Sequence, residues 1–285
     1  MTQNSLPEIP GFEQISFHLQ DQTRAVYRAG TGPAVIVMSE IPGITPQVAR
    51  FARYVVDAGF TVFMPQLFGT PMRPLTPGYV AQSLARVCIN REFRLLAAHQ
   101  SSPIVEWLRA LARQAHEECG GPGVGAIGMC LTGNFALAMM LDAPVIAPVL
   151  SQPSLPGGVT REQRAALHAS PLEIAAAHDK IDRHGARILG LRFKGDPMCR
   201  PERFERLRQE FGDAFEGIEL DDRHANPRAM KPAHSVVTTH LIDKAGEPTR
   251  AALDRVLAFF REQLKSSNQK LVQTARKIKP IRKAT

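Results

Sequence analysis

The stretch GAIGMCLTG, residues 125–133, is the part of the sequence that decides the fold. It opens with a short apolar run typical of a buried strand, passes through a turn, and leads directly into an apolar segment of helical length. A cysteine, Cys130, stands at the turn between Gly128 and Gly133. The glycines suit a tight turn, because side chains two or three residues from the strained residue would clash with neighbouring backbone.

Short apolar runs alternate with amphipathic stretches on both sides of this turn. This order predicts a largely parallel sheet with helices on both faces, preceded by two early strands that pair as a hairpin. The early strands are expected at 13–19 and 24–30 and the others at 34–39, 61–64, 124–127, 144–150, 187–193 and 215–220. Helices are expected at 46–58, 80–98, 102–118, 131–141, 171–183, 201–211 and 248–264.

Length and charge indicate how the chain is divided. With 285 residues, 44% of them hydrophobic, the chain can bury one large core, and a single α/β domain over 1–264 is expected. Seven of its Lys and Arg residues fall within 265–285, which holds no acidic residue, so nearly all of the net charge of +8 lies there. We expect 265–285 to be a basic, mobile tail. The rest is almost neutral, so no nucleic-acid partner is expected.

Membrane, disulfide and metal functions find no support in the sequence. No segment approaches the roughly 20 consecutive apolar residues of a membrane helix, and the first residues show no secretory signal pattern. The cysteines fit neither a zinc pattern nor a disulfide framework, and the histidines show no metal-ligand spacing such as HExxH. We therefore expect reduced thiols, a cytoplasmic location, and no metal or cofactor. The four cysteines are Cys88, Cys119, Cys130 and Cys199.

Cys130 is the candidate nucleophile. Its place between a strand and a helix is that of the nucleophile elbow, in which the pattern G-x-S-x-G presents a serine. A helix beginning at Leu131 would aim its amide groups and positive dipole end at the sulfur and favour the reactive thiolate. The alternative is a small buried thiol in an ordinary turn. The other cysteines lack such a turn and are expected to be structural.

An elbow nucleophile needs an acid and a histidine that follow it in the chain. Asp196 is favoured because it lies just past the strand at 187–193 in a KGDP turn, although an Asx turn before Pro197 explains it equally well. His234, in the loop before the last helix, is favoured as the base, with His224 as its rival. Among the other acids, Asp142 and Asp213 are further candidates, Asp179 and Asp182 are expected on a helix, and Asp221 and Asp222 as a solvated pair. The other histidines are expected to be surface or satisfied core residues: His168, His178, His184 and His240.

The chain resembles the dienelactone hydrolase family, which has an α/β-hydrolase fold. The resemblance spans roughly 35–264 and rests on VIVMSEIPGITPQVARFARYVVDAGFTVFMPQLFG, GAIGMCLTGNFAL, LGLRFKGDP, and AHS before a last helix. It implies a triad of Cys130, Asp196 and His234. It also implies that Glu40, in SEIPG, pairs with the thiol and accepts its proton. The oxyanion hole would then be the backbone amides of Leu131 and Ile41.

Two positions depart from the family pattern. Gln66 stands where the family has an aspartate, and Thr238 stands where dienelactone-cleaving members have an arginine that binds the substrate carboxylate. A second family arginine would correspond to Arg86 or Arg91. With one carboxylate clamp missing, a substrate other than dienelactone is expected.

The sequence therefore predicts a cofactor-independent hydrolase of a small ester or lactone. A thioesterase or acyltransferase with the same three residues stays open as an alternative. So does a non-catalytic protein of this fold that senses oxidants or binds a ligand through Cys130. No membrane partner is expected, and the oligomeric state is left open.

Overall fold

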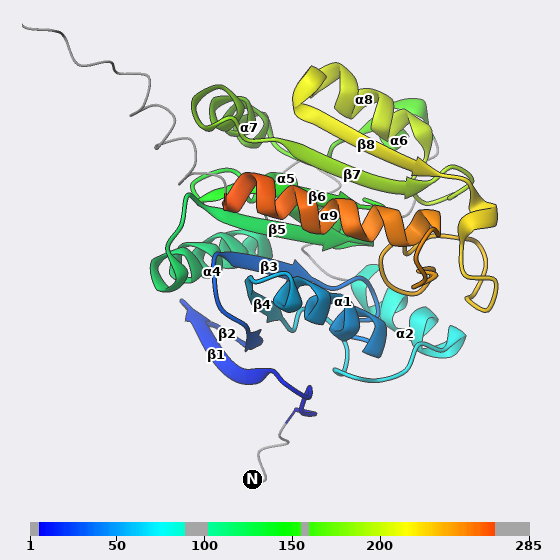
Figure 1. The fold of residues 1–285 in the computed structure, drawn as a ribbon, viewed down its shortest axis with the longest axis horizontal. Helices are drawn as coiled ribbons and strands as arrows, with labels where there is room; N and C mark the ends of the chain where they lie inside the picture. Colours follow the sequence, from blue (N-terminus) through cyan, green and yellow to red (C-terminus); the bar gives the residue numbers. More distant parts are fainter. Residues whose placement is uncertain (1–5, 89–101, 155–159, 266–285) are drawn as a thin grey trace, which may run out of the picture.

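The computed structural model describes residues 6–88, 102–154 and 160–265. One eight-stranded sheet runs through its centre in the order β1-β2-β4-β3-β5-β6-β7-β8 (Figure 1). The strands are β1 Glu13–Leu19, β2 Gln22–Ala29, β3 Ala34–Met38, β4 Thr61–Pro65, β5 Val124–Met129, β6 Val145–Ser151, β7 Ile188–Phe193 and β8 Phe215–Leu220. All eight expected strands are thus present.

The sheet is parallel from β4 to β8 and antiparallel at one edge. β1 pairs with β2 and β2 with β4 in antiparallel register, whereas β4, β3, β5, β6, β7 and β8 form parallel neighbours. The predicted α/β-hydrolase fold with a mostly parallel sheet is confirmed. Because parallel strands end at one edge, the loops after β3, β5 and β7 meet there, and ligands of such sheets bind at that edge.

Helices cover both faces of the sheet. Figure 1 shows α1 and α9 in front of the strands, and α4 and α5 behind them. The helices α1 and α4 begin at prolines, and the preceding Thr45 and Ser102 accept a hydrogen bond from the amide three residues on, as N-caps do. The helices are α1 Pro46–Asp57, α2 Pro77–Cys88, α4 Pro103–Cys119, α5 Gly133–Ala138, α6 Arg161–Ala165, α7 Pro171–His184, α8 Pro201–Phe211 and α9 Pro248–Leu264.

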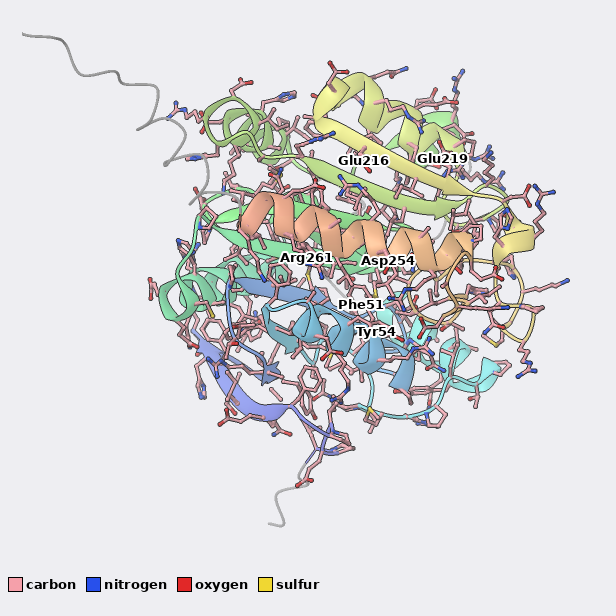
Figure 2. The ribbon with its side chains drawn as sticks, in the orientation of Figure 1. Phe51, Tyr54, Glu216, Glu219, Asp254 and Arg261 are labelled. Carbon is pink, nitrogen blue, oxygen red and sulfur yellow. The ribbon has the colours of Figure 1, made fainter. Side chains whose placement is uncertain are left out.

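The core lies between the central strands and these helices. Every residue of β3, β4, β5, β6 and β7 is buried, as expected for strands covered on both faces. Phe51 of α1 points into this core, while the edge strand β8 carries Glu216 and Glu219 (Figure 2). Arg255 of α9 binds Glu216 through two hydrogen bonds of 2.7 Å, so this edge of the sheet is charged and paired.

The largest differences from the sequence predictions fall at two helices. The helix expected over 131–141 begins within a 3-10 turn, Cys130–Thr132, continues as the short helix α5, and ends at Ala138, before its expected end. The helix expected over 80–98 is found as α2 to Cys88, and the rest lies outside the described residues. So does the expected tail beyond Lys265. None of the described helices is long and apolar enough to cross a membrane.

Candidate active site

Cys130 occupies a strained turn at the carboxyl end of β5. Its φ is +57°, in the left-handed region that non-glycine residues seldom adopt and that costs about 1–3 kcal/mol. Its carbonyl accepts a hydrogen bond of 3.0 Å from the amide of Ser154, in the loop after β6. The turn is thus held by the neighbouring strand, and the half-buried thiol lies at the sheet edge where ligands bind.

The elbow is closed by Thr132 rather than by a second nearby glycine. Thr132 stands where G-x-S-x-G has its last glycine, and Gly133 follows one residue later. The Thr132 hydroxyl contacts the Met129 amide at 2.8 Å and the Met38 carbonyl at 3.1 Å, which ties the turn to β3. A Cβ at Gly128 would lie 1.9 Å from the Thr132 carbonyl oxygen, so Gly128 has no room for a side chain.

Asp196 and His234 meet although they are 38 residues apart. The Nδ1 atom of His234 lies 2.6 Å from Oδ2 of Asp196, and both side chains are buried. The other carboxylate oxygen accepts a hydrogen bond of 2.9 Å from the Met198 amide, which is an Asx turn. The Asx turn expected at Asp196 is confirmed, and the second oxygen of the same carboxylate contacts His234.

His234 carries a perturbed pKa that links it to Cys130. Burial acts to lower the pKa of His234, but the Cys130 sulfur and the Asp196 carboxylate outweigh burial and raise that pKa well above its usual value. Both residues line the same cavity, and the Nε2 atom of His234 is buried with no hydrogen-bond partner among the described residues. Such an arrangement stabilises an imidazolium beside a thiolate.

Glu40 is held by side chains of the His234 loop. The Thr238 hydroxyl donates to its Oε1 at 2.6 Å, and the Ser235 hydroxyl donates to its Oε2 at 2.5 Å. Gln152 donates to the same Oε2 at 3.3 Å. Within the described residues no hydrogen bond joins Glu40 to Cys130. Three donors therefore hold this buried carboxylate in place.

Cys130, His234 and Glu40 line one cavity of about 150 Å³. Apart from these residues its described lining is largely apolar, and it includes two methionines, Met198 and Met230, whose side chains are 41% and 38% exposed. Exposed methionines at the mouth of a cavity offer adaptable apolar surface to a ligand. The other described lining residues are Ile41, Leu75, Val80, Lys231, Pro232, Ser235, Thr239 and His240.

The remaining sequence-predicted site residues divide into two groups. Leu131 directly follows Cys130 in the 3-10 turn, and Ile41 follows Glu40 and lines the cavity; their role as oxyanion amides stays a prediction. Arg86 belongs to α2, but its side chain lies outside the described residues, as does the whole of Arg91. His224, the rival of His234, lies in the 3-10 turn after β8 and does not line the cavity.

Several supporting residues carry no local sequence signal. Gln152, Ser235 and Thr238 bind Glu40 from positions 112 to 198 residues away. Behind the elbow, Asn134 donates to the Leu131 carbonyl at 3.0 Å and itself accepts from the buried Arg203 at 2.8 Å. Only the three-dimensional fold brings such pairs together. His240, expected to be a surface or satisfied core residue, contacts the backbone of His234.

A model of the dienelactone hydrolase family matches residues 22–214, which is more than half of the chain and includes the elbow and Asp196. In the part of the chain that the structure describes, no cluster of three or more His, Cys, Asp or Glu residues could hold a metal ion.

Individual relatives are more distant. A Saccharomyces cerevisiae protein provisionally assigned as a carboxymethylenebutenolidase is 27% identical over 139 residues, which are 49% of this chain and 44% of that protein. The match thus spans less than half of the relative's length. A crystal structure from Klebsiella pneumoniae, provisionally described as a dienelactone hydrolase, has a TM-score of 0.59 at 20% identity and covers 87% of this chain and 97% of its own. The dienelactone hydrolase from Anabaena variabilis has a TM-score of 0.52 at 16% identity, covering 89% and 99%.

Proposed function

Because the chain belongs to the dienelactone hydrolase family, we propose that it hydrolyses a carboxylic ester or lactone with Cys130 as nucleophile, His234 as base and Asp196 as the acid that orients the histidine. One observation carries the proposal. Cys130 and Asp196 both act on His234 to raise its pKa against its burial, while Asp196 holds its Nδ1 at 2.6 Å. A base poised between a nucleophile and an orienting carboxylate is the arrangement that acyl transfer requires.

In the first half of the reaction, the Cys130 thiolate attacks the carbonyl carbon of the substrate and a carbon–sulfur bond forms. The carbonyl oxygen becomes an oxyanion, to which the amides of Leu131 and Ile41 donate hydrogen bonds. As the carbon–oxygen bond of the ester breaks, the alkoxide takes the proton from the His234 imidazolium. The raised pKa of His234 keeps this proton available at neutral pH. For a lactone the alcohol stays attached to the acyl group.

In the second half, the now neutral His234 takes a proton from water, and the hydroxide attacks the thioester carbonyl. The carbon–sulfur bond breaks, the acid leaves, and the thiolate and imidazolium are restored. Asp196 keeps the Nδ1 proton of His234 in place throughout, so that Nε2 is the atom that exchanges protons with substrate and water. No cofactor enters this sequence of steps.

Glu40 acts in this proposal as an anchor rather than as the thiol's base. Its oxygens accept hydrogen bonds from Ser235, Thr238 and Gln152, and two of these donors belong to the loop that carries His234. Moving the carboxylate to the sulfur would leave buried hydroxyl groups unpaired, which costs about 1–3 kcal/mol for each group. The carboxylate therefore fixes the loop while His234 handles the proton.

The apolar lining supports a substrate with an apolar acyl or alcohol group. Met198, Met230 and Leu75 line the cavity beside Cys130, and a volume of about 150 Å³ suits a short chain or small ring. We also keep in the proposal the expectation of a cytoplasmic enzyme acting on a small molecule, since the described cysteines are unpaired.

Two variants test the function. Cys130→Ala should abolish turnover of p-nitrophenyl acetate and butyrate, while Cys119→Ala, at the end of α4 and outside the cavity lining, should leave turnover unchanged. Mass spectrometry of the quenched wild-type protein should find the acyl group on the peptide that contains Cys130. Undiminished turnover in Cys130→Ala would reject the proposal.

A further inference from the structure

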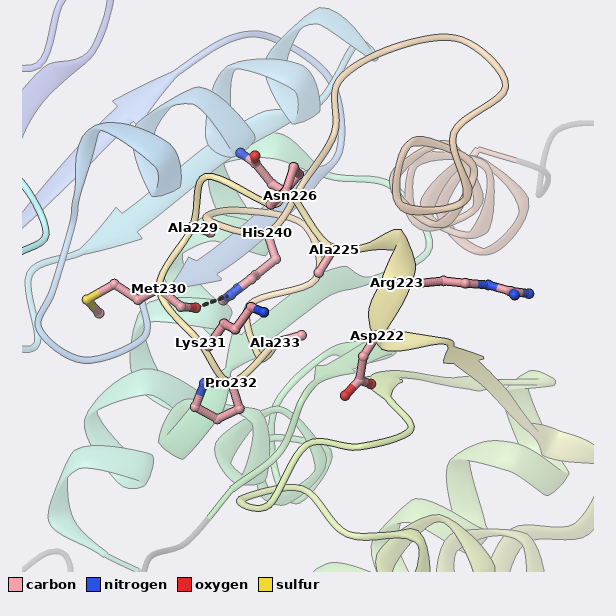
Figure 3. Close-up of a pocket in the computed structure, with 11 residues that line it drawn as sticks. Asp222, Arg223, Ala225, Asn226, Ala229, Met230, Lys231, Pro232, Ala233 and His240 are labelled. Atoms are coloured by element: carbon pink, nitrogen blue, oxygen red, sulfur yellow. Dashed lines mark hydrogen bonds between the residues drawn. The ribbon is translucent and has the colours of Figure 1, made fainter.

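The imidazole of His240 lies at the base of the loop that carries His234. Its Nδ1 atom accepts hydrogen bonds from the backbone amides of Ser235, at 3.1 Å, and His234, at 3.4 Å. Its Nε2 atom lies 2.7 Å from the carbonyl oxygen of Met230 (Figure 3). Amides only donate and carbonyls only accept, so a single form of the ring satisfies all three contacts: the neutral imidazole with its proton on Nε2.

The same ring touches the strand that leads to the acid. His240 packs edge-on against Phe193, with ring centroids 5.9 Å apart and planes at 68°. Phe193 is the last residue of β7, and its carbonyl accepts a hydrogen bond of 3.3 Å from the Asp196 amide. One side chain thus contacts the backbone of His234 and the strand end that positions its partner Asp196.

The backbone of His240 completes the connection. Its amide donates to the Ser235 carbonyl at 3.0 Å, and its carbonyl accepts from the Asn226 amide at 2.9 Å. Figure 3 shows His240 among the residues that lead from Asn226 to Ala233, the segment just before His234. The residue therefore joins the segment before the candidate base to the backbone after it.

From this geometry we infer that His240 is a positioning residue for the proposed reaction: its neutral ring holds His234 in register with Asp196 and Cys130, and protonation of its Nδ1 releases that register. A proton on Nδ1 would face the backbone N–H groups of Ser235 and His234, so the hydrogen bonds from both amides to the ring would be lost. The effect of His240 on catalysis rests on the proposed function, whereas the hydrogen bonds of its ring do not depend on it.

The charges around His240 favour the neutral ring at neutral pH. Burial lowers the pKa of His240, and the nearby His234 lowers it further. The hydrogen bond to Met230 and the carboxylates of Glu40 and Asp196 raise it, and burial prevails. The favourable contribution of the neutral ring is therefore present above the ordinary histidine pKa and is lost as pH falls through the lowered pKa. Charged residues that line the hollow on the ring's other side are Asp222, Arg223 and Lys231.

Two near-isosteric variants separate the two ends of the ring. In His240→Asn the side-chain oxygen can stand near Nδ1 and still accept from the amides of Ser235 and His234, although the contact with Met230 is lost. In His240→Gln the amide nitrogen can keep the contact with Met230, but no acceptor faces the two amides. The inference expects His240→Gln to lower kcat by about 10- to 100-fold with little change in KM, as a misplaced catalytic group does.

His240→Asn should keep kcat within about threefold of wild type, because alignment is retained, and should lose the acid-side inflection of the pH profile that His240 causes. The matched control is His178→Gln, on the half-exposed face of α7 away from the cavity, which should match wild type. Equal losses of kcat in the Asn and Gln variants, or a Gln variant with wild-type kcat and pH profile, would overturn the inference.

A second readout does not depend on ester turnover. The rate at which iodoacetamide alkylates Cys130, followed by peptide mass spectrometry, reports the pairing of the thiol with His234. It should fall in His240→Gln and persist in His240→Asn. If the alkylation rates of wild type and the two variants follow this pattern but wild type cleaves no ester, the hydrolase proposal fails while the role of His240 stands. If a variant does not fold, nitrogen NMR of the wild-type ring decides: Nδ1 without a proton at neutral pH supports the inference, and a protonated Nδ1 overturns it.

Discussion

Replacing Glu40 distinguishes a carboxylate that anchors a loop from one that takes the thiol's proton. In Glu40→Gln the shape is kept and the charge is removed. The new amide nitrogen can donate to the Thr238 hydroxyl, and the remaining oxygen can accept from Ser235 and Gln152 at the sites now 2.5 Å and 3.3 Å away. All three contacts survive this change because hydroxyl groups can rotate and act as donor or acceptor.

The expected stability change follows from these contacts. Hydrogen bonds to a charged group contribute about 1.5–3 kcal/mol and neutral ones about 0.5–1.5 kcal/mol, so making all three contacts neutral costs about 3 kcal/mol. Relief of the buried charge offsets part of this loss, and we expect the free energy of unfolding to fall by about 1–2 kcal/mol. Glu40→Ala leaves two hydroxyls and one amide unpaired and should lower it by about 3–6 kcal/mol.

Urea denaturation measures these differences, and turnover of p-nitrophenyl butyrate measures their effect on chemistry. If Glu40 is an anchor, Glu40→Gln keeps kcat within about tenfold, whereas loss of a general base lowers kcat by about 10²–10⁴-fold. Gln66→Glu, at a half-buried loop position outside the cavity lining, controls for a Glu/Gln exchange near the sheet edge. A collapse of kcat in Glu40→Gln at nearly unchanged stability would refute the anchoring role.

Three further predictions concern the elbow and its charge. Cys130→Ala removes a group that raises the pKa of His234, so an NMR titration of the variant should give a lower pKa for His234, and an unchanged titration would contradict the coupling of the two side chains. In wild type, turnover should decline as pH rises through the raised pKa of His234, because the imidazolium that protonates the leaving group is lost. Thr132→Val should lower the free energy of unfolding by about 1–3 kcal/mol in urea, because buried backbone groups lose a partner, and Thr132→Ser should lower it less; equal values would rule out the hydroxyl's role. Gly128→Ala places a methyl group 1.9 Å from a carbonyl oxygen and should reduce Tm and turnover together. The control is Gly78→Ala, where a methyl group meets nothing within 4 Å, and it should change neither quantity. A stable, active Gly128→Ala protein would show that the turn can relax.

Most strands and helices could be predicted from the sequence, because the spacing of apolar residues and the turn residues determine secondary structure locally. The apolar run at 34–39 and the Pro46 helix start were found within a residue or two of their expected positions. The helix expected after Cys130 differs more: the apolar pattern continues without a break, but the chain forms a 3-10 turn before α5, next to the positive φ of the cysteine. Backbone strain at one residue leaves no mark on a hydrophobic pattern.

The candidate site was predictable only in part, and for a related reason. Chain order and strand ends suggested Cys130, Asp196 and His234, which the fold brings together around one ring. His240 was set aside, because nothing in its neighbours indicates that its ring caps the amides six and five residues before it. Contacts between a side chain and loop backbone depend on the loop's path, which local propensity does not encode.

The departure at position 238 gains a physical meaning from the structure. Thr238 is buried and its hydroxyl binds Glu40, so this position serves the carboxylate and not a ligand. An arginine here would present a buried cation to Glu40, and the short hydroxyl instead closes the hydrogen bonds of the carboxylate within the protein. Among the described residues that line the cavity, Lys231 is then the one basic side chain besides the histidines, and it is exposed at the mouth beside Met230. Under the proposed function, a substrate whose carbonyl reaches Cys130 meets the apolar residues of this lining, and among the described lining residues an anionic group would find only this exposed cation, where such pairing contributes about 0–1 kcal/mol. We therefore expect the proposed hydrolase to select its substrate by apolar shape, with charge recognition secondary.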